Sequence, residues 1–285
     1  MTHAAGQLLV LGAGGRLGRL LRACWPDQDD VIWHSRRGGA DLCFDPLTDG
    51  AALTEAARGA RAILCLSGVT HWRAAQTGVS LSLNTDLALA AIDGAAQAGV
   101  GRVFLASSAA VYGRATGSLD EAGECDPVSD YGLAKLSMER AAQARGQSRG
   151  VAVCSLRIGN VAGADAILDG WRVGFVLDQF ADGSTPRRSY IGPRSLSRVL
   201  DALSRKAALP ECINVAAPGA VALGALLDAA DLEWKPRPAE AGSIASVELS
   251  TSRLDRLTRL GHASIGAANL VREWRASCPG SETAQ

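Results

Sequence analysis

The sequence predicts an α/β fold built around a doubly wound parallel sheet, and three observations support this prediction. Short apolar runs of strand length alternate along the 285 residues with longer segments of helical periodicity. The first of these runs passes through a glycine-rich turn straight into a helical pattern. The segments between successive runs are long enough for the crossovers that parallel strands require.

The first strand, turn and helix form the most informative of these units. Residues 7–11 are an apolar run that predicts a buried strand, and residues 12–18 (G-A-G-G-R-L-G) follow at once. Gly12 permits a tight turn, Gly15 lets backbone N–H groups approach a pyrophosphate, and Gly18 lets the helix pack closely. The helix N-terminus adds positive potential. The apolar residues of the helical pattern are Leu17, Leu20, Leu21 and Cys24. This order of elements predicts a dinucleotide site.

The remaining elements continue the alternation. The expected strands cover residues 30–34, 40–44, 62–66, 102–106, 151–156 and 213–216. The expected helices cover residues 49–58 and 81–98, and a further helix carries Tyr131 and Lys135. Residues 69–73 are expected to leave the fourth strand as a loop, on the side where ligands enter such sheets. No internal repeat or low-complexity linker interrupts this order.

Composition excludes several classes of protein. The formal net charge is zero, so nothing favours nucleic acid or an anionic membrane as a partner. No apolar stretch is long enough to cross a bilayer, and the N-terminus lacks the basic and apolar regions of a secretory signal. The seven cysteines form no C-x-x-C pair, which argues against structural disulfides and against a zinc or other metal site. We therefore expect a cytoplasmic protein, with Cys43, Cys65 and Cys154 filling the core.

A tyrosine and a lysine four residues apart suggest the chemistry. Tyr131 and Lys135 share one face of the expected helix, about one turn apart. An ammonium there can hold the ribose hydroxyls of a dinucleotide and lower the pKa of the phenol from about 10. Such a phenol can exchange a proton with a carbonyl or alcohol while hydride moves at the same carbon. The spacing alone is common, and a packed tyrosine beside a solvated lysine is the alternative.

Three segments, taken in order, resemble the extended short-chain dehydrogenases/reductases, the NAD-dependent epimerase/dehydratase family. Gly12, Gly15 and Gly18 match the cofactor glycines of that family. Residues 107–113 (S-S-A-A-V-Y-G) match its catalytic-serine segment, and Tyr131 and Lys135 match its catalytic pair. The resemblance implies a Rossmann-type fold with a small C-terminal substrate-binding lobe. It implies a dinucleotide-binding domain over residues 1–160 and a lobe over residues 161–285 that is interleaved with late elements of the main sheet.

The resemblance also implies roles for individual residues. Ser108 is expected to donate a hydrogen bond to the substrate carbonyl oxygen, Tyr131 to transfer the proton, and Lys135 to hold the nicotinamide ribose. Asp45 matches an aspartate that meets the adenine amino group, and Asn84 matches an asparagine that braces the active site; a helix cap or turn is the alternative for both. The residues expected to bind the cofactor are Gly12, Gly15, Arg16, Leu17, Gly18, Ser35, Arg36, Arg37, Asp45, Leu66, Ser67, Gly68, Asn84 and Lys135.

The end of the second strand bears on which dinucleotide binds. An NAD enzyme usually places an acid there, which accepts a hydrogen bond from the adenosine 2′-hydroxyl. This chain instead has Ser35, Arg36 and Arg37. Two guanidinium groups can bind a 2′-phosphate bidentately, and the serine adds a hydroxyl donor. The sequence therefore favours NADP(H) over NAD(H), with a solvated arginine turn as the alternative.

The substrate side matches the family less closely. Asn160 lies in a segment that resembles R-x-x-N-V-x-G, and Arg188 resembles the arginine that meets the substrate diphosphate. Residues 192–195 (G-P-R-S) depart from the pattern that follows in the family, so a nucleotide-sugar substrate is not established. His71 and Trp72 are candidates for a wall of the substrate pocket, and ordinary packing is their alternative role. Together with Ser108 and Tyr131, these residues are the expected substrate contacts.

The expected function follows from these assignments. Ala109 and Ala110 stand where nucleotide-sugar dehydratases carry an acid pair, which argues against elimination of water. We expect an NADP(H)-dependent oxidoreductase that reduces a carbonyl, or oxidises the alcohol, of a small polar substrate, with sugars and nucleotide sugars as candidates. The alternatives are a nucleotide-sugar epimerase with tightly held NAD(P) and a non-catalytic NADP(H)-binding sensor. Family members often dimerise through the helix that carries Tyr131, so a homodimer is expected there.

Overall fold

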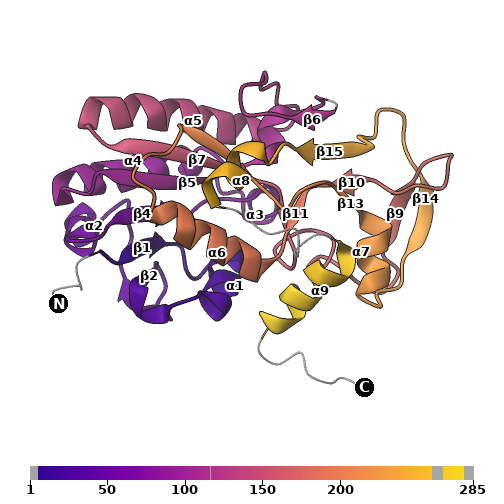
Figure 1. Ribbon diagram of the computed structural model, residues 1–285, viewed down its shortest axis with the longest axis horizontal. Helices are drawn as coiled ribbons and strands as arrows, with labels where there is room; N and C mark the ends of the chain where they lie inside the picture. The colour runs from indigo at the N-terminus through magenta and orange to yellow at the C-terminus, as the bar shows by residue number, and fades with distance from the viewer. Residues whose placement is uncertain (1–5, 116, 259–265, 279–285) are drawn as a thin grey trace.

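A parallel sheet forms the centre of the molecule (Figure 1). The computed structural model describes residues 6–115, 117–258 and 266–278, and within these residues the sheet has seven strands in the order β12-β7-β5-β4-β1-β2-β3. The strands are β1 (Leu8–Leu11), β2 (Val31–Ser35), β3 (Leu42–Cys43), β4 (Ala62–Cys65), β5 (Arg102–Ser108), β7 (Ala152–Ile158) and β12 (Cys212–Val215). The chain winds outward in both directions from β1, which leaves a topological switch point between β1 and β4, the position where ligands bind in such sheets.

Helices cover both faces of this sheet, and the alternation of side chains along β1 shows why. Leu8 and Val10 face one side, where they pack with α1 (Arg16–Cys24), α6 (Pro193–Ser204) and α8 (Ser252–Thr258). Leu9 and Leu11 face the other side, which is covered by α2 (Gly50–Ala57), α4 (Leu83–Ala98) and α5 (Asp130–Arg149). Because both faces are covered, the strands read as continuous apolar runs. The predicted doubly wound α/β fold is confirmed.

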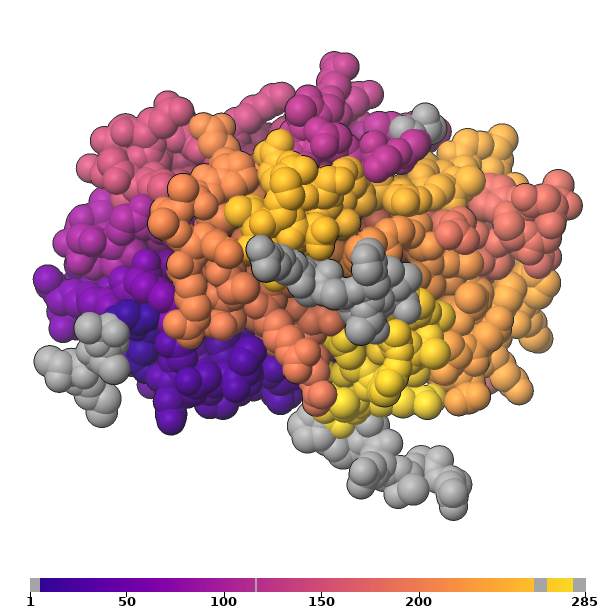
Figure 2. Space-filling model, viewed as in Figure 1, coloured from indigo at the N-terminus to yellow at the C-terminus, as the bar shows by residue number. Residues whose placement is uncertain are grey.

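Short strands and two helices lie beyond the main sheet, toward the end of the molecule opposite α2 (Figures 1 and 2). Many of their buried residues share a separate core, whereas Leu119 and Leu249 pack with Tyr112 in another cluster. The smaller sheets contain β6 (Ser118–Leu119), β8 (Asn160–Val161), β9 (Val176–Gln179), β10 (Arg187–Arg188), β11 (Tyr190–Ile191), β13 (Val221–Ala222), β14 (Lys235–Pro238) and β15 (Ser246–Leu249). The helices are α7 (Leu223–Ala229) and α9 (Ala267–Ala276). We call this group of elements the C-terminal lobe. Between its segments, α6 and β12 return to the main sheet.

Several local expectations are wrong. Residues 71–77 form a short helix, α3 (His71–Thr77), because the Thr70 hydroxyl caps it by accepting from Arg73 N. Residues 40–44 contain only the two-residue edge strand β3, so Cys43 is exposed and does not fill the core as Cys65 and Cys154 do. The remaining elements are the single-turn helices η1 (Gln28–Asp30) and η2 (Ala109–Tyr112). None of the helices in the described ranges combines the length and hydropathy that a bilayer crossing needs.

Candidate active site

The turn between β1 and α1 depends on its glycines. Gly12 has a φ of +101°, which L side chains rarely adopt, and a Cβ there would lie 2.7 Å from the Ser67 nitrogen. A Cβ on Gly18 would overlap the Gly12 carbonyl oxygen and lie 2.7 Å from the Ala13 Cα. The turn therefore packs against the end of β4 and against the first turn of α1 at distances that only glycine allows.

This turn has the features that a dinucleotide pyrophosphate needs. Gly15 is the N-cap of α1, no side chain caps the helix, and no acid lies in its first turn. Gly14 and Gly15 are exposed, so a ligand can approach the backbone N–H groups of Arg16 and Leu17, which head the helix. An uncapped helix N-terminus behind a glycine cradle fits an anionic group, and the residues present here thus fit the expected cofactor.

The two arginines that follow β2, both expected at the adenosine side of the cofactor, differ in their surroundings. Ser35 is buried, and its hydroxyl lies so close to Gly14 that a Cβ there would come within 2.5 Å of it. Arg36 Nη1 lies 3.6 Å from Asp45 Oδ2, so its charge is partly neutralised. The Asp45 Oδ1 atom accepts from Leu47 N and thereby shapes its own turn. Arg37 is exposed, and no carboxylate among the described residues forms an ion pair with it.

The segment after β4 joins the glycine turn to the expected catalytic lysine. Leu66 N donates to Leu11 O, and Ser67 packs on Gly12. Gly68 lies so close to the Asn84 amide oxygen that a Cβ on residue 68 would not fit. Asn84 Oδ1 accepts from Lys135 Nζ at 3.0 Å and from Val69 N at 3.2 Å. Its Nδ2 donates to two backbone carbonyls. Protein groups thus take up both ends of this amide, and the contact with Lys135 agrees with the bracing role expected for Asn84. Its contact with the cofactor stays a prediction.

Ser108, Tyr131 and Lys135 converge at the carboxyl end of β5. Ser108 ends the strand, and Tyr131 lies in the first turn of α5, which Ser129 caps by accepting from Gly132 N at 3.1 Å. The Ser108 hydroxyl lies near enough to the Tyr131 hydroxyl to act on its pKa. Lys135 Nζ donates to Ala106 O at 2.8 Å and lies 5.7 Å from the centre of the Tyr131 ring. The structure therefore brings two hydroxyls and an ammonium to one place.

Burial controls the electrostatics of these groups. It raises the pKa of Tyr131, and the nearby Ser108 hydroxyl offsets that rise only in part. Burial also lowers the pKa of Lys135 to about 8. The expectation that Lys135 brings the phenol below its usual pKa is wrong for this structure. The reason is that desolvation of the phenol dominates, while the ammonium donates to Ala106 and Asn84 instead of to the phenol oxygen.

The expected substrate residues Asn160 and Arg188 lie around a buried tyrosine. β8 and β11 pair so that Asn160 lies opposite Tyr190, whose hydroxyl is buried. Arg188 is half-buried, burial lowers its pKa, and no carboxylate in the described part of the chain forms an ion pair with it. Asp165, next to Tyr190, is buried, which raises its pKa to about 6. A guanidinium that forms no ion pair with a carboxylate and lies beside polar side chains is a suitable partner for an anionic group.

His71 and Trp72 lie in the first turn of α3, and both are exposed. The guanidinium of Arg16 lies 5.5 Å from the centre of the Trp72 ring, and Arg16 Nε lies 2.8 Å from Asp169 Oδ2. Trp72 is therefore placed beside the glycine turn, and Asp169 connects that turn to the C-terminal lobe. Sequence reasoning missed Asp169, because an acid on a loop after the sixth long strand carries no signal of its partner.

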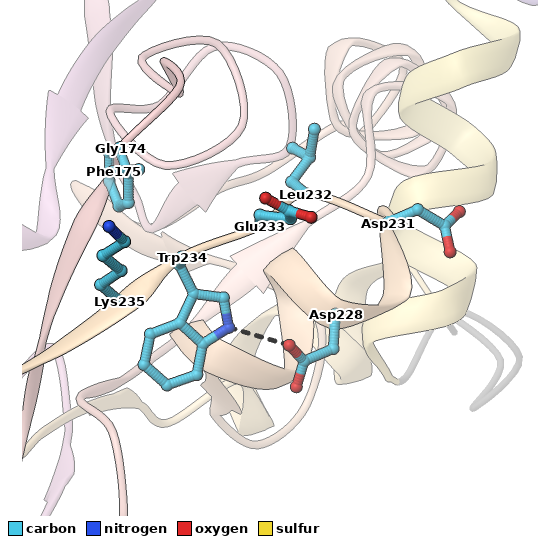
Figure 3. A pocket seen from close by; sticks show the side chains of 8 residues that line it. All are labelled: Gly174, Phe175, Asp228, Asp231, Leu232, Glu233, Trp234 and Lys235. Carbon is cyan, nitrogen blue, oxygen red and sulfur yellow. Dashed lines mark hydrogen bonds between the residues drawn. The ribbon is translucent and has the colours of Figure 1, made fainter. Parts of the chain in front are cut away.

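A cavity of about 540 Å³ lies in the C-terminal lobe (Figure 3). In it the Trp234 Nε1 donates to Asp228 Oδ1 at 2.8 Å. None of the expected catalytic, cofactor or substrate residues lines it. Its lining residues are Gly174, Phe175, Asp228, Asp231, Leu232, Glu233, Trp234 and Lys235. The convergence of Ser108, Tyr131 and Lys135 is thus a feature separate from this cavity.

Comparison with known proteins places the chain in a family. The sequence model of the NAD dependent epimerase/dehydratase family matches residues 8–180, which is more than half of the chain. The chain belongs to the NAD dependent epimerase/dehydratase family. The resemblance drawn from the glycine turn and the serine, tyrosine and lysine segments is therefore confirmed, and with it the assignment to a family of NAD(P)-dependent enzymes. Among curated proteins, no sequence matches this family member.

Solved structures share the fold of this epimerase/dehydratase family member over nearly its whole length. MoeE5 in complex with UDP-glucose and NAD is 23% identical, with a TM-score of 0.73 over 95% of this chain and 99% of that one. UDP-N-acetylglucosamine 4-epimerase from Methanobrevibacter ruminantium M1 is 19% identical, with a TM-score of 0.75 over 96% and 99%. The NDP-hexosamine 5,6-dehydratase TunA is 20% identical, with a TM-score of 0.76 over 96% and 98%. At these identities the likeness establishes the fold.

Proposed function

We propose that this chain is an NADP(H)-dependent oxidoreductase that interconverts a carbonyl and an alcohol on a small polar substrate. The observation that carries the proposal is the convergence of the Ser108 and Tyr131 hydroxyls with the Lys135 ammonium at the end of β5. When bound, the nicotinamide cofactor supplies or accepts the hydride. The glycine turn at residues 12–18 holds its pyrophosphate, and Lys135 holds a ribose.

The three residues divide the work at the substrate oxygen. The Ser108 hydroxyl donates a hydrogen bond to the carbonyl oxygen and orients it. The Tyr131 hydroxyl gives that oxygen a proton during reduction and takes the proton back during oxidation. The ammonium of Lys135 stabilises the tyrosinate that forms after proton transfer. Because the site is shielded from water, the attraction between the Lys135 ammonium and the tyrosinate is stronger there than it would be in bulk solvent.

Arg37 supports NADP(H) as the preferred dinucleotide. β2 ends without an acid, and Arg37 carries a charge that no carboxylate in the described residues pairs with. A 2′-phosphate gains charge-assisted hydrogen bonds from such a guanidinium, whereas a ribose hydroxyl gains less. Arg36 contributes less, because Asp45 already shares its charge.

Arg188 supports an anionic substrate, and a nucleotide sugar is the class that fits best. Its half-buried guanidinium is available to a diphosphate, and Asn160 and Tyr190 add polar contacts beside it. Structures with the same fold contain UDP-glucose and UDP-glucuronic acid. A nucleotide-sugar epimerase that keeps its NAD(P) is the second candidate, because the same serine, tyrosine and lysine would serve it. Ala109 and Ala110 provide no carboxylate for a dehydratase.

The test is a panel of nucleotide sugars, and of the corresponding keto sugars, followed at 340 nm and by mass spectrometry. Stoichiometric loss of NADPH with reduced product supports the oxidoreductase. Product formed without net loss of NADPH indicates the epimerase. Tight dinucleotide binding without turnover of any substrate would point to a sensor and contradict the catalytic proposal.

A homodimer through α4 and α5 also remains a proposal. On α5, Leu133 is exposed, as is Val128 in the segment that precedes the helix. Burial of these side chains against a second copy would remove apolar surface from water. Sedimentation of the protein and of a Leu133→Glu variant tests this interface, since a dimer there becomes a monomer in the variant.

A further inference from the structure

A buried ion pair connects α5 to the main sheet below the proposed catalytic residues. Arg157 Nη2 lies 2.9 Å from Glu139 Oε2, and Arg157 Nε donates to both carboxylate oxygens at 3.2 and 3.3 Å. Both side chains are 8% exposed. Desolvation of two charges offsets much of their attraction, so such a pair contributes little net stability compared with an apolar pair. Its presence in the core calls for another role.

The carboxylate of this pair touches the elements that carry the catalytic groups. Glu139 Oε1 accepts a short hydrogen bond from the hydroxyl of Ser107, which directly precedes Ser108 at the end of β5. Glu139 also lies four residues after Lys135, on the same face of α5. One side chain therefore contacts the strand end that bears the catalytic hydroxyl and shares a helix face with the catalytic ammonium.

The ion pair is held in place from the other side. Arg157 Nη1 donates to Tyr112 Oη at 3.1 Å, and the guanidinium lies 5.0 Å from the centre of the Tyr112 ring. The Tyr112 hydroxyl in turn donates to Asn214 Oδ1 on β12 at 2.7 Å. These contacts fix Arg157 to the sheet, so the position of Glu139 is set by β7 and β12 as well as by its own helix.

We propose that Glu139 is a positioning residue, whose carboxylate fixes the end of β5 through Ser107 and supplies the counter-charge for the Lys135 ammonium. This inference rests on the proposed function, in which Lys135 is an active-site group.

The groups around Lys135 identify Glu139 as the source of this counter-charge. Tyr131 faces the ammonium from its own helix, and Asn84 on α4 and Ala106 on β5 face it as neutral acceptors. Cys65 faces it from β4, but burial raises the pKa of that thiol to about 11, so it is neutral at pH 7. Among the described residues, the ionisable groups that act on Lys135 are Cys65 and Glu139, and only Glu139 is a carboxylate. Its charge raises the pKa of Lys135 against the larger opposing effect of burial.

The chain offers a direct test, because Lys135 is one of only three lysines in the sequence, with Lys206 and Lys235. In protein labelled with ¹³C at lysine Cε, the signal missing from Lys135→Met assigns Lys135, and its pH titration is followed without dinucleotide or substrate. In Glu139→Gln, we expect the Lys135 midpoint to fall by about half a pH unit or more, because an anion is lost and the Arg157 cation is left unpaired.

The direction of the change separates positioning from a merely structural role. If the substitution only loosened the core, water would reach the ammonium and the midpoint would rise; a rise or no change would overturn the proposal. Ser197→Ala is a control for the loss of a buried polar contact elsewhere in the core, on α6, and it should leave the midpoint unchanged. If the unpaired Arg157 prevents folding of Glu139→Gln, the double variant Glu139→Gln/Arg157→Met removes both charges and should still show the fall.

Because this titration uses neither substrate nor dinucleotide, it separates the two proposals. A fall in the midpoint supports the role of Glu139 even if the substrate panel shows no turnover. An unchanged midpoint in a protein that turns substrate over rejects the role of Glu139 and leaves the proposed function standing.

Discussion

At the scale of single residues, the site depends on groups held in unfavourable surroundings. Lys135 is an ammonium in the core, and Arg188 is a half-buried guanidinium for which the described residues provide no counter-ion. Sequence patterns pointed to both residues, because they lie within motifs. They could not predict the pKa directions, since desolvation depends on which side chains the fold packs around each group. The Tyr131 pKa is the clearest case, because a lysine one turn away suggested the opposite direction.

Lys135 should make folding stability depend on pH in the alkaline range. Burial lowers its pKa from 10.5 to about 8, so between these values the unfolded chain binds the proton and the folded chain does not. The unfolding free energy of the native protein should therefore rise with pH, relative to Lys135→Met, by on the order of 3 kcal/mol from pH 7.5 to 10.5. Urea unfolding of both proteins at steps of pH measures this. A constant difference would show that Lys135 is not desolvated.

Arg37 should decide between the two dinucleotides. In Arg37→Ala, we expect the Kd for NADPH to increase about tenfold or more, because charge-assisted hydrogen bonds contribute about 1.5–3 kcal/mol, while the Kd for NADH changes little. Isothermal titration calorimetry with both dinucleotides measures the ratio. Arg36→Ala is the matched control and should have a smaller effect, since Asp45 pairs with Arg36. Equal losses for NADPH and NADH would reject a 2′-phosphate site at Arg37.

At the scale of elements, the sequence predicted most where the local pattern and the fold agree. The long strands and the helices α2 and α4 lie within a few residues of their expected bounds, because each is marked by an apolar pattern. The helix expected to carry Tyr131 and Lys135 is α5. The short strands of the C-terminal lobe, such as β10 and β13, were not predicted. Two-residue strands exist only through their pairing with distant segments, so no local pattern marks them.

The glycine turn gives a prediction at this scale. In Gly18→Ala, the added methyl group meets the backbone of Gly12 and Ala13, which cannot move aside, so α1 must shift away from its turn. We expect a loss of about 1–3 kcal/mol in unfolding free energy and a marked loss of dinucleotide affinity. Gly50→Ala is the control, because a Cβ there meets nothing within 4 Å, and its stability should stay equal or rise slightly. Full dinucleotide affinity in Gly18→Ala would contradict the assigned pyrophosphate site.

At the scale of the whole molecule, an ion pair between Arg16 and Asp169 connects the glycine turn with the C-terminal lobe. Arg16 and Asp169 are each more than one-third exposed, so the pair contributes at most about 1 kcal/mol to stability. Its position matters more than its strength, because Arg16 follows the turn that fits a pyrophosphate. We therefore expect a bound pyrophosphate to compete with Asp169 for the guanidinium. The sequence alone could not reveal this pair, since its members are far apart in the chain.

Removal of Asp169 should tighten dinucleotide binding. In Asp169→Ala, we expect the Kd for NADPH to fall about two- to fivefold, because a competing anion is lost, with little change in the unfolding temperature. Arg16→Ala should raise the Kd instead. Fluorescence titration at low and high salt measures both effects, which should shrink as salt screens the charges. Weaker binding by Asp169→Ala would mean that the ion pair holds the site in its binding geometry.

In the proposed reaction, the Tyr131 hydroxyl transfers the proton, and the dinucleotide binds whether or not that hydroxyl is present. The most direct measurement is the turnover of Tyr131→Phe on the best substrate of the panel, together with its Kd for NADPH. We predict that turnover falls at least about 100-fold, the usual contribution of a positioned acid or base, while the Kd stays within about twofold of the native value. Turnover close to that of the native protein would contradict the account.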